Sequence, residues 1–180
     1  MALVGGRTFI FIHIYKCGGM SLRTLIQDSI PCFELEKSHS TALETREKLK
    51  AVGMQHIWDS SYKFSFVRNP FDWVVSLYEF IRHTPSHENY EEVKDFNFEQ
   101  FCQWNIDSII YGKDNSNGKF HTLTQFLYDD GNLLVDVVGR MEDFDSDVHL
   151  ILNNLQIANE KIPKINPSHR GLIITMLAVI

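Results

Sequence analysis

An apolar strand that runs into a diglycine loop and then into a helix opens the sequence. Residues 7–14 (RTFIFIHI) are rich in β-branched and aromatic side chains, which predicts a buried strand. The turn YKCGG follows, and the apolar residues of MSLRTLIQDSI then have helical spacing. A helix start presents backbone N–H groups and the positive end of the helix dipole, so this β–loop–α unit is suited to hold an anion.

The loop carries groups that a phosphate ligand needs. Lys16 supplies a mobile positive charge, and Ser21 supplies a hydroxyl donor. Gly18 and Gly19 allow the backbone to approach a ligand closely. The pattern is not the common nucleotide-triphosphatase loop GxxxxGK[ST], because the lysine precedes the glycines and that motif occurs nowhere in the chain. Alone, KCGGMS is also consistent with a simple strand–turn–helix connection that carries a surface lysine.

A second cationic segment follows the next predicted strand. Residues 62–67 (YKFSFV) alternate in the manner of a strand, Arg68 stands at the strand end, and residues 70–83 form an amphipathic helix. The guanidinium fork suits bidentate phosphate binding, and Ser76, about two turns into the helix, can meet the same phosphate. The alternative is an ion pair between Arg68 and Asp72, with Ser76 as a helix spacer.

The order of the elements predicts the fold class. Further expected elements are helices over 41–51 (with Thr41 and Glu44 as a capping box), 97–111 and 141–155, an exposed acidic loop over 84–96, and either a hairpin or a tight turn before a strand at Asp130-Gly131. Strands that alternate with helices favour an α/β fold with a mainly parallel sheet. Ligands bind beyond the carboxyl ends of parallel strands, so Lys16 and Arg68 can face one crevice.

Composition excludes several classes of function. The net charge of -6 argues against broad nucleic-acid binding. Cys17, Cys32 and Cys102 have no paired spacing, and the histidines form no HExxH-like pair, so we expect free thiols and no metal. The apolar runs FIFIHIY and GLIITMLAVI are shorter than the roughly 20 residues of a membrane span. We therefore expect a soluble protein of the cytoplasm.

Together, the two cationic segments resemble the sulfotransferase family, especially its carbohydrate sulfotransferase branch. FIHIYKCGGMSL is similar to the family's 5′-phosphosulfate-binding loop, and KFSFVRNPFDWVVSLY to its 3′-phosphate-binding segment. WDSSYKF and VDVVGRMEDF also resemble bacterial members, and the resemblance covers residues 7–169. It implies a P-loop-like three-layer α/β/α sandwich. It also implies transfer of a sulfuryl group from 3′-phosphoadenosine 5′-phosphosulfate (PAPS) to an acceptor hydroxyl, expected to belong to a carbohydrate.

The resemblance also implies roles for individual residues. Lys16 would contact the bridging oxygen or the 5′-phosphosulfate and offset charge on the leaving group, while Arg68 and Ser76 would bind the 3′-phosphate. The remaining cofactor-binding residues would be those of the loop and helix start: Cys17, Gly18, Gly19, Met20, Ser21 and Leu22.

The candidate general base is His39 in KSHST, where members of this family often carry a histidine. Its unperturbed pKa of about 6.5 suits this role. Glu34 and Glu36 compete for the same role, and His39 as a surface or capping-region residue is the alternative.

Some features depart from the family pattern. Tyr15 stands where the family often has proline, and Cys17 and Met20 stand where it often has hydroxyl residues. After INPSHR, relatives usually continue into a tyrosine-rich helical tail, so we expect one domain of residues 1–180 that is truncated or divergent after about residue 170. Two other functions stay open: a catalytically impaired nucleotide-binding remnant, or a P-loop-type kinase.

Three further side chains are ambiguous. His13 is expected to be a core or sheet-edge histidine. Cys17, near a helix start, can have a lowered pKa and be sensitive to oxidation. Arg140 is expected either to pair with Glu142 or Asp143, or to contact the ligand.

Overall fold

The computed structural model describes residues 2–4, 7–22, 39–111 and 121–155. The chain divides into two compact units. The first comprises residues 1–69 and 123–166, and the second comprises residues 70–122 and 167–180.

The first unit is built on a sheet whose described strands have the order β1-β2-β3-β6. These strands are β1 (Ala2–Val4), β2 (Arg7–Ile12), β3 (Tyr62–Val67) and β6 (Val137–Arg140). β2 pairs with β3 and β3 pairs with β6 in parallel, whereas β1 lies antiparallel to β2. The mainly parallel α/β class predicted from the sequence is confirmed, although the edge strand β1 was not predicted.

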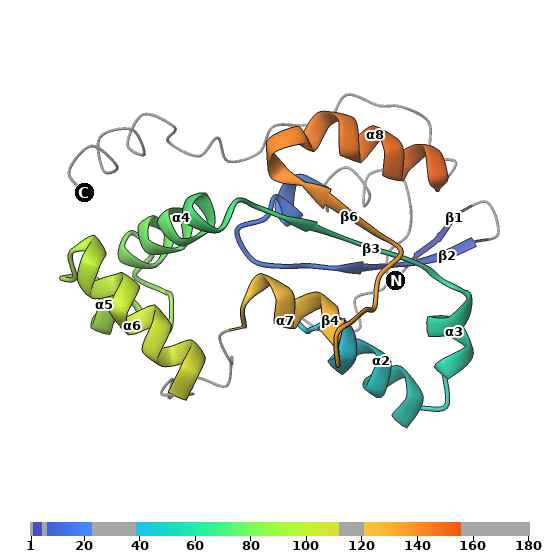
Figure 1. Cartoon of the computed structure of the whole chain (residues 1–180), viewed down its shortest axis with the longest axis horizontal. Coiled ribbons are helices and arrows are strands. Elements are labelled where there is room, and N and C mark those ends of the chain that lie inside the picture. Colours follow the sequence, from blue (N-terminus) through green and yellow to red (C-terminus); the bar gives the residue numbers. More distant parts are fainter. Residues whose placement is uncertain (1, 5–6, 23–38, 112–120, 156–180) are drawn as a thin grey trace. The chain divides into compact units, whose positions relative to one another are not determined.

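Both faces of this sheet are covered by helices. Phe64, Ser65 and Phe66 are all buried, and successive side chains of a strand point to opposite faces. α8 (Phe144–Asn154) lies over one face; α2 (Ala42–Ala51), α3 (Gln55–Ser60) and α7 (Leu123–Leu127) lie over the other (Figure 1). The first unit therefore has the α/β/α layering that the sequence predicted.

Aromatic rings fill the face of the sheet beneath α8. Phe64 lies at the centre, with ring centroids at most 6.0 Å from those of Phe9, Phe11 and Tyr62. Phe66 meets Phe144 at 5.1 Å, where α8 begins. Gly139 leaves room for the Phe66 ring, because a Cβ at that position would lie 2.5 Å from Phe66 Cε1. The Phe66–Phe144 contact fixes the start of α8 to the end of β3.

Local signals account for the start of α2 and for a hairpin. The Glu44 N–H donates to Thr41 Oγ1 at 3.1 Å, and the Thr41 N–H donates to Glu44 Oε2 at 2.8 Å, which confirms the predicted capping box. β4 (Tyr128–Asp129) and β5 (Asn132–Leu133) form a hairpin. Its turn residues Asp130 and Gly131 have φ of 46° and 79°, as a two-residue hairpin turn requires.

The second unit contains α4 (Pro70–Arg82), α5 (Tyr90–Val93) and α6 (Phe98–Tyr111). α4 and α6 confirm the predicted helices to within a residue at each end, whereas the expected acidic loop contains the short helix α5. The buried Tyr78 joins the elements: its ring lies 5.2 Å from Phe101, and its hydroxyl donates to the Phe96 carbonyl at 2.7 Å. Among the helices of the described residues, none has the length and apolarity needed to span a membrane.

Asp136→Ala should lower the free energy of unfolding by about 1–3 kcal/mol. The Asp136 carboxylate accepts the Lys63 N–H at 2.6 Å and lies 3.3 Å from Lys63 Nζ, whose side chain is only 12% exposed. Urea unfolding measures the loss. Asp59→Ala on α3 is the matched control, expected to change stability by less than about 0.5 kcal/mol because Asp59 is exposed. Equal losses in the two variants would contradict the prediction.

Candidate functional site

Three segments of the first unit meet at the carboxyl edge of its sheet. Residues 13–18 follow β2, Arg68 and Asn69 follow β3, and the short 3-10 helix η1 (Met141–Asp143) follows β6. β2, β3 and β6 are parallel neighbours, so their carboxyl ends lie side by side. Lys16 and Arg68 therefore follow adjacent strands at one edge, as expected from the sequence.

The loop after β2 is fitted against η1 and α8. Gly18 has a φ of 72°, and a Cβ there would overlap Met141 Sδ and lie 3.1 Å from Phe144 Cε2. Glycine is required for both reasons. Lys16 also has a positive φ, 60°, which is uncommon for a non-glycine residue and persists where the surroundings fix the backbone. The loop shape is thus set by contacts with segments far away in the sequence.

A helix begins directly after this loop. Residues 19–22 are helical, and the Leu22 N–H donates to the Gly18 carbonyl at 3.2 Å. A Cβ at Gly19 would overlap the His13 imidazole, so a protein side chain fills the space beside this glycine. Ser21 and Leu22 are buried, whereas Met20 is 51% exposed. The first turn is therefore anchored by its glycine and its two buried residues.

Lys16 and Arg68 lie close enough for their charges to interact. Burial lowers the pKa of Lys16, and the positive charge of Arg68 lowers this pKa further. The Arg68 backbone N–H is directed at the sulfur of Cys17, which places the two loops in contact. In the described part of the first unit, no carboxylate pairs with the Arg68 guanidinium. Such an edge is suited to a ligand with more than one negative charge.

Cys17 is a buried thiol rather than a reactive one. It is 1% exposed, and burial raises its pKa to about 12, with a contribution from the negative charge of Glu142. The prediction of a lowered pKa was wrong, because the thiol points into the protein instead of toward the open end of the helix. Cys17 therefore stays protonated at neutral pH.

The acidic residues of η1 form a hydrogen bond and an ion pair at this edge of the sheet. Glu142 Oε1 accepts the Asn69 N–H at 2.6 Å, which joins the segments after β3 and β6. Arg140 Nη2 pairs with Asp143 at 2.5 Å, which is one of the alternatives expected for Arg140. Glu142 was not among the site residues predicted from the sequence. The acidic pair of VGRMED, close behind the last strand, could have indicated it.

His39 lies beside the loop. Its Nδ1 is 2.9 Å from the His13 carbonyl oxygen, and its ring lies 4.5 Å from that of His13 and 5.5 Å from that of Tyr15. A carbonyl only accepts, so Nδ1 carries the proton and Nε2 of the neutral ring is the acceptor. The surrounding protein lowers the pKa of His39, and the hydrogen bond to His13 opposes this shift. The residue as a whole remains exposed, which limits the shift.

For other predicted residues, the structure gives no contact with this edge among the residues that it describes. Ser76 belongs to α4 of the second unit, and its contact with a 3′-phosphate stays a prediction. Glu34 and Glu36 lie outside the described residues. Across the ranges that the structure describes, no three His, Cys, Asp or Glu residues are grouped so that they could hold a metal ion.

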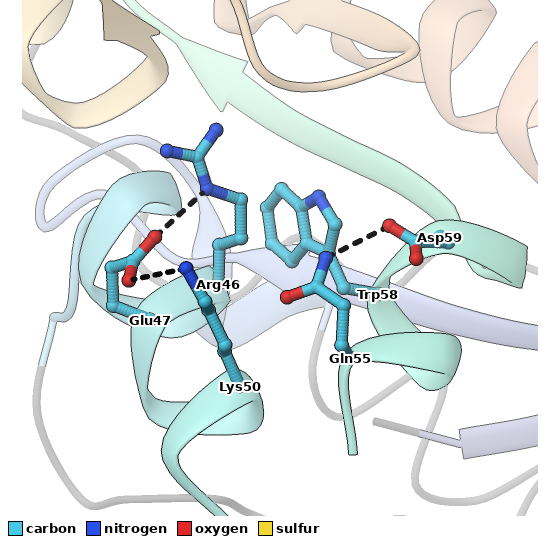
Figure 2. A pocket seen from close by; sticks show the side chains of 6 residues that line it. All are labelled: Arg46, Glu47, Lys50, Gln55, Trp58 and Asp59. Carbon is cyan, nitrogen blue, oxygen red and sulfur yellow. Dashed lines mark hydrogen bonds and ion pairs between the residues drawn. The ribbon is translucent and has the colours of Figure 1, made fainter. Parts of the chain in front are cut away.

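A hollow of about 400 Å³ between α2 and α3 is a second concave feature, lined by Arg46, Glu47, Lys50, Gln55, Trp58 and Asp59 (Figure 2). Both of its cationic side chains pair with carboxylates. Arg46 contacts Glu47 at 3.3 Å and Asp129 at 2.9 Å, and Lys50 lies 3.9 Å from Glu47. Figure 2 shows the Trp58 indole between the Arg46 and Gln55 side chains, but Trp58 is only 6% exposed. This hollow does not have the cationic character of the loop edge.

Comparison with known proteins gives one result. The family model described as "Sulfotransferase family" matches residues 5–172, a span that includes all three segments at the sheet edge. No curated protein matches the chain. No solved structure matches it either. Because the family match covers well over half of the sequence, the chain belongs to the sulfotransferase family, whose members move a sulfuryl group from a donor to an acceptor.

Proposed function

We propose that this protein transfers the sulfuryl group of PAPS to an acceptor hydroxyl, which we expect to belong to a carbohydrate. The observation that carries the proposal is the pair of cationic side chains, Lys16 and Arg68, at the ends of adjacent parallel strands. PAPS is anionic at both its 3′ and 5′ positions, so it needs positive charge at two points. Family membership supports the reaction class, and the cationic edge supports this donor.

Lys16 and the loop would hold the 5′-phosphosulfate. The N–H groups of the loop and helix start, from Cys17 to Leu22, would surround its oxygens. As the bond between sulfur and the 5′-phosphate oxygen breaks, negative charge grows on that oxygen, and the Lys16 ammonium would offset it. The protein thus supplies positioning and charge stabilisation, as in phosphoryl transfer.

Arg68 would bind the 3′-phosphate with its guanidinium, and Ser76 would add a hydroxyl donor. The half-buried position of Arg68 favours this role, because its backbone N–H is engaged with Cys17 while its side chain has no carboxylate partner in the described part of its unit. The 3′-phosphate distinguishes PAPS from ordinary adenine nucleotides. Arg68 would therefore provide donor selectivity.

His39 would act as the general base. Its Nε2 would take the proton of the acceptor hydroxyl as that oxygen forms its bond to sulfur and the 5′-phosphate leaves. The products are a sulfated acceptor and adenosine 3′,5′-bisphosphate, and the imidazolium then returns its proton to water. The hydrogen bond from Nδ1 to the His13 carbonyl keeps the ring in the tautomer that this step needs.

Lys16→Ala should lower the rate of sulfate transfer by about 10²–10³-fold, because it removes the positive charge beside the leaving oxygen. Transfer from radiolabelled PAPS to a panel of glycans and small alcohols measures the rate. Lys50→Ala, at an exposed position on α2, is the matched control and should leave the rate unchanged. Nucleotide binding by the unaltered chain without transfer to any acceptor, or magnesium-dependent binding of ATP in place of PAPS, would contradict the proposal.

Arg68→Ala should weaken binding of adenosine 3′,5′-bisphosphate by about 10–100-fold and leave binding of adenosine 5′-monophosphate unchanged. The difference arises because only the first nucleotide carries the 3′-phosphate. Isothermal titration with both nucleotides measures it. An equal loss for the two nucleotides would show that Arg68 does not bind the 3′-phosphate.

The transfer rate should have a bell-shaped dependence on pH. Neutral His39 is the active form and the surrounding protein lowers its pKa, so the rate should fall only below the ordinary imidazole value of about 6.5. The pKa of Lys16 is also lowered, so its positive charge is lost on the alkaline side at a lower pH than for a free lysine.

His39→Ala should remove the acid limb and lower the rate by about 10²–10⁴-fold. His56→Ala, exposed on α3, is the control; an unchanged acid limb in His39→Ala would exclude His39 as the base.

A further inference from the structure

His13 connects the diglycine loop to His39. Its main-chain carbonyl accepts the Nδ1–H of His39 at 2.9 Å. Its ring meets the His39 ring edge-on, with 4.5 Å between centroids and 61° between planes. The same ring occupies the space beside Gly19 that a Cβ would need. One residue therefore contacts both the candidate base and the first turn of the helix.

The His13 ring is held from the sheet as well. It stacks on Phe11 with 5.6 Å between centroids and 21° between planes, and Phe11 in turn stacks on Phe64 at 5.3 Å. The imidazole is thus a continuation of the aromatic layer beneath α8. Because protein interiors are close-packed, a ring confined by Phe11, His39 and Gly19 has little freedom to move.

We propose that His13 is a positioning residue that sets the placement of His39 relative to the Gly19 backbone. The inference rests on the proposed function: Gly19 lies on the donor side and His39 on the acceptor side of the transferred group. In-line transfer depends on this separation, since a misplacement of about 1 Å can cost roughly 10²-fold in rate. A single imidazole that contacts both sides holds the separation constant.

The surroundings of His39 define what removal of the His13 ring should do. In the described residues, the titratable rings packed against His39 are those of His13 and Tyr15, and Lys16 follows in the same loop. Without the His13 ring, water reaches more of His39, and its pKa should rise toward the ordinary value of about 6.5. The acid limb of the rate would then move to higher pH.

The first test compares His13→Ala with His13→Phe in the full chain. His13→Ala should raise the pKa of His39 in an NMR titration of its ring protons, move the acid limb to higher pH, and lower the transfer rate by about tenfold or more. His13→Phe keeps a ring of similar size and should restore most of the rate. His83→Ala, at an exposed position directly after α4, is the control and should change none of these.

The second test is a double-mutant cycle with Gly19→Ala. In the unaltered background the new Cβ would overlap the His13 ring, so binding of adenosine 3′,5′-bisphosphate should weaken by about tenfold. In the His13→Ala background the overlap is absent, and the loss should be less than about threefold. Equal losses in both backgrounds would show that the two residues do not act together.

The experiments distinguish a failure of the proposed function from a failure of the role of His13. Lack of adenosine 3′,5′-bisphosphate binding by the unaltered chain would overturn the proposed function and this inference with it. Binding and transfer by the unaltered chain, with His13→Ala unchanged in transfer rate, acid limb and His39 pKa, would overturn the role of His13 alone.

Discussion

Two positive charges held close together at one edge of a sheet are the constraint on which the site depends. The parallel register pairs Phe11 with Phe64 and Ile12 with Ser65, so β2 and β3 end side by side. Ser65 reinforces this pairing, because its hydroxyl donates to the Ile12 carbonyl at 2.7 Å from a fully buried position. Main-chain pairing thus brings Lys16 and Arg68 close together. The pKa of Lys16 is lowered mainly by burial and further by the positive charge of Arg68. A ligand with two anionic groups would offset this repulsion.

The third parallel strand gives the edge its shape. β6 leads into η1. There Met141 packs against Gly18, and the Glu142 carboxylate accepts the Asn69 N–H. Phe144, at the start of α8, packs on Phe66 in the sheet, and its ring also borders the space beside Gly18. The loop after β2 is therefore braced by the same packing that fixes α8 on the sheet, and its geometry is coupled to the stability of the core.

The parts of the fold that local chemistry controls could be predicted from the sequence. β3, the capping box at Thr41 and the Asp130-Gly131 turn follow from alternation, capping residues and turn residues over a few positions. The loop motif and the Arg68 segment are also contiguous, which is why they indicated the family. β1, α3, α5 and α7 were missed, because a strand of three residues and helices of fewer than two turns carry too few positions for a clear period.

The details of the site depend on contacts between distant segments, and these could not be predicted. Gly18 needs to be glycine because of Met141, more than a hundred positions later in the chain. The raised pKa of Cys17 follows from burial that no neighbouring residue signals. The contact of His13 with Gly19 arises because the helix start folds back onto the end of β2, so a residue expected to belong to the core or sheet edge lies at the loop instead.

A crystal structure with adenosine 3′,5′-bisphosphate bound tests the central claim most directly. We expect a single nucleotide with its 5′-phosphate on Lys16 and the N–H groups of the loop, and its 3′-phosphate on the Arg68 guanidinium. A nucleotide bound elsewhere, or one that contacts only one of these two side chains, would contradict it.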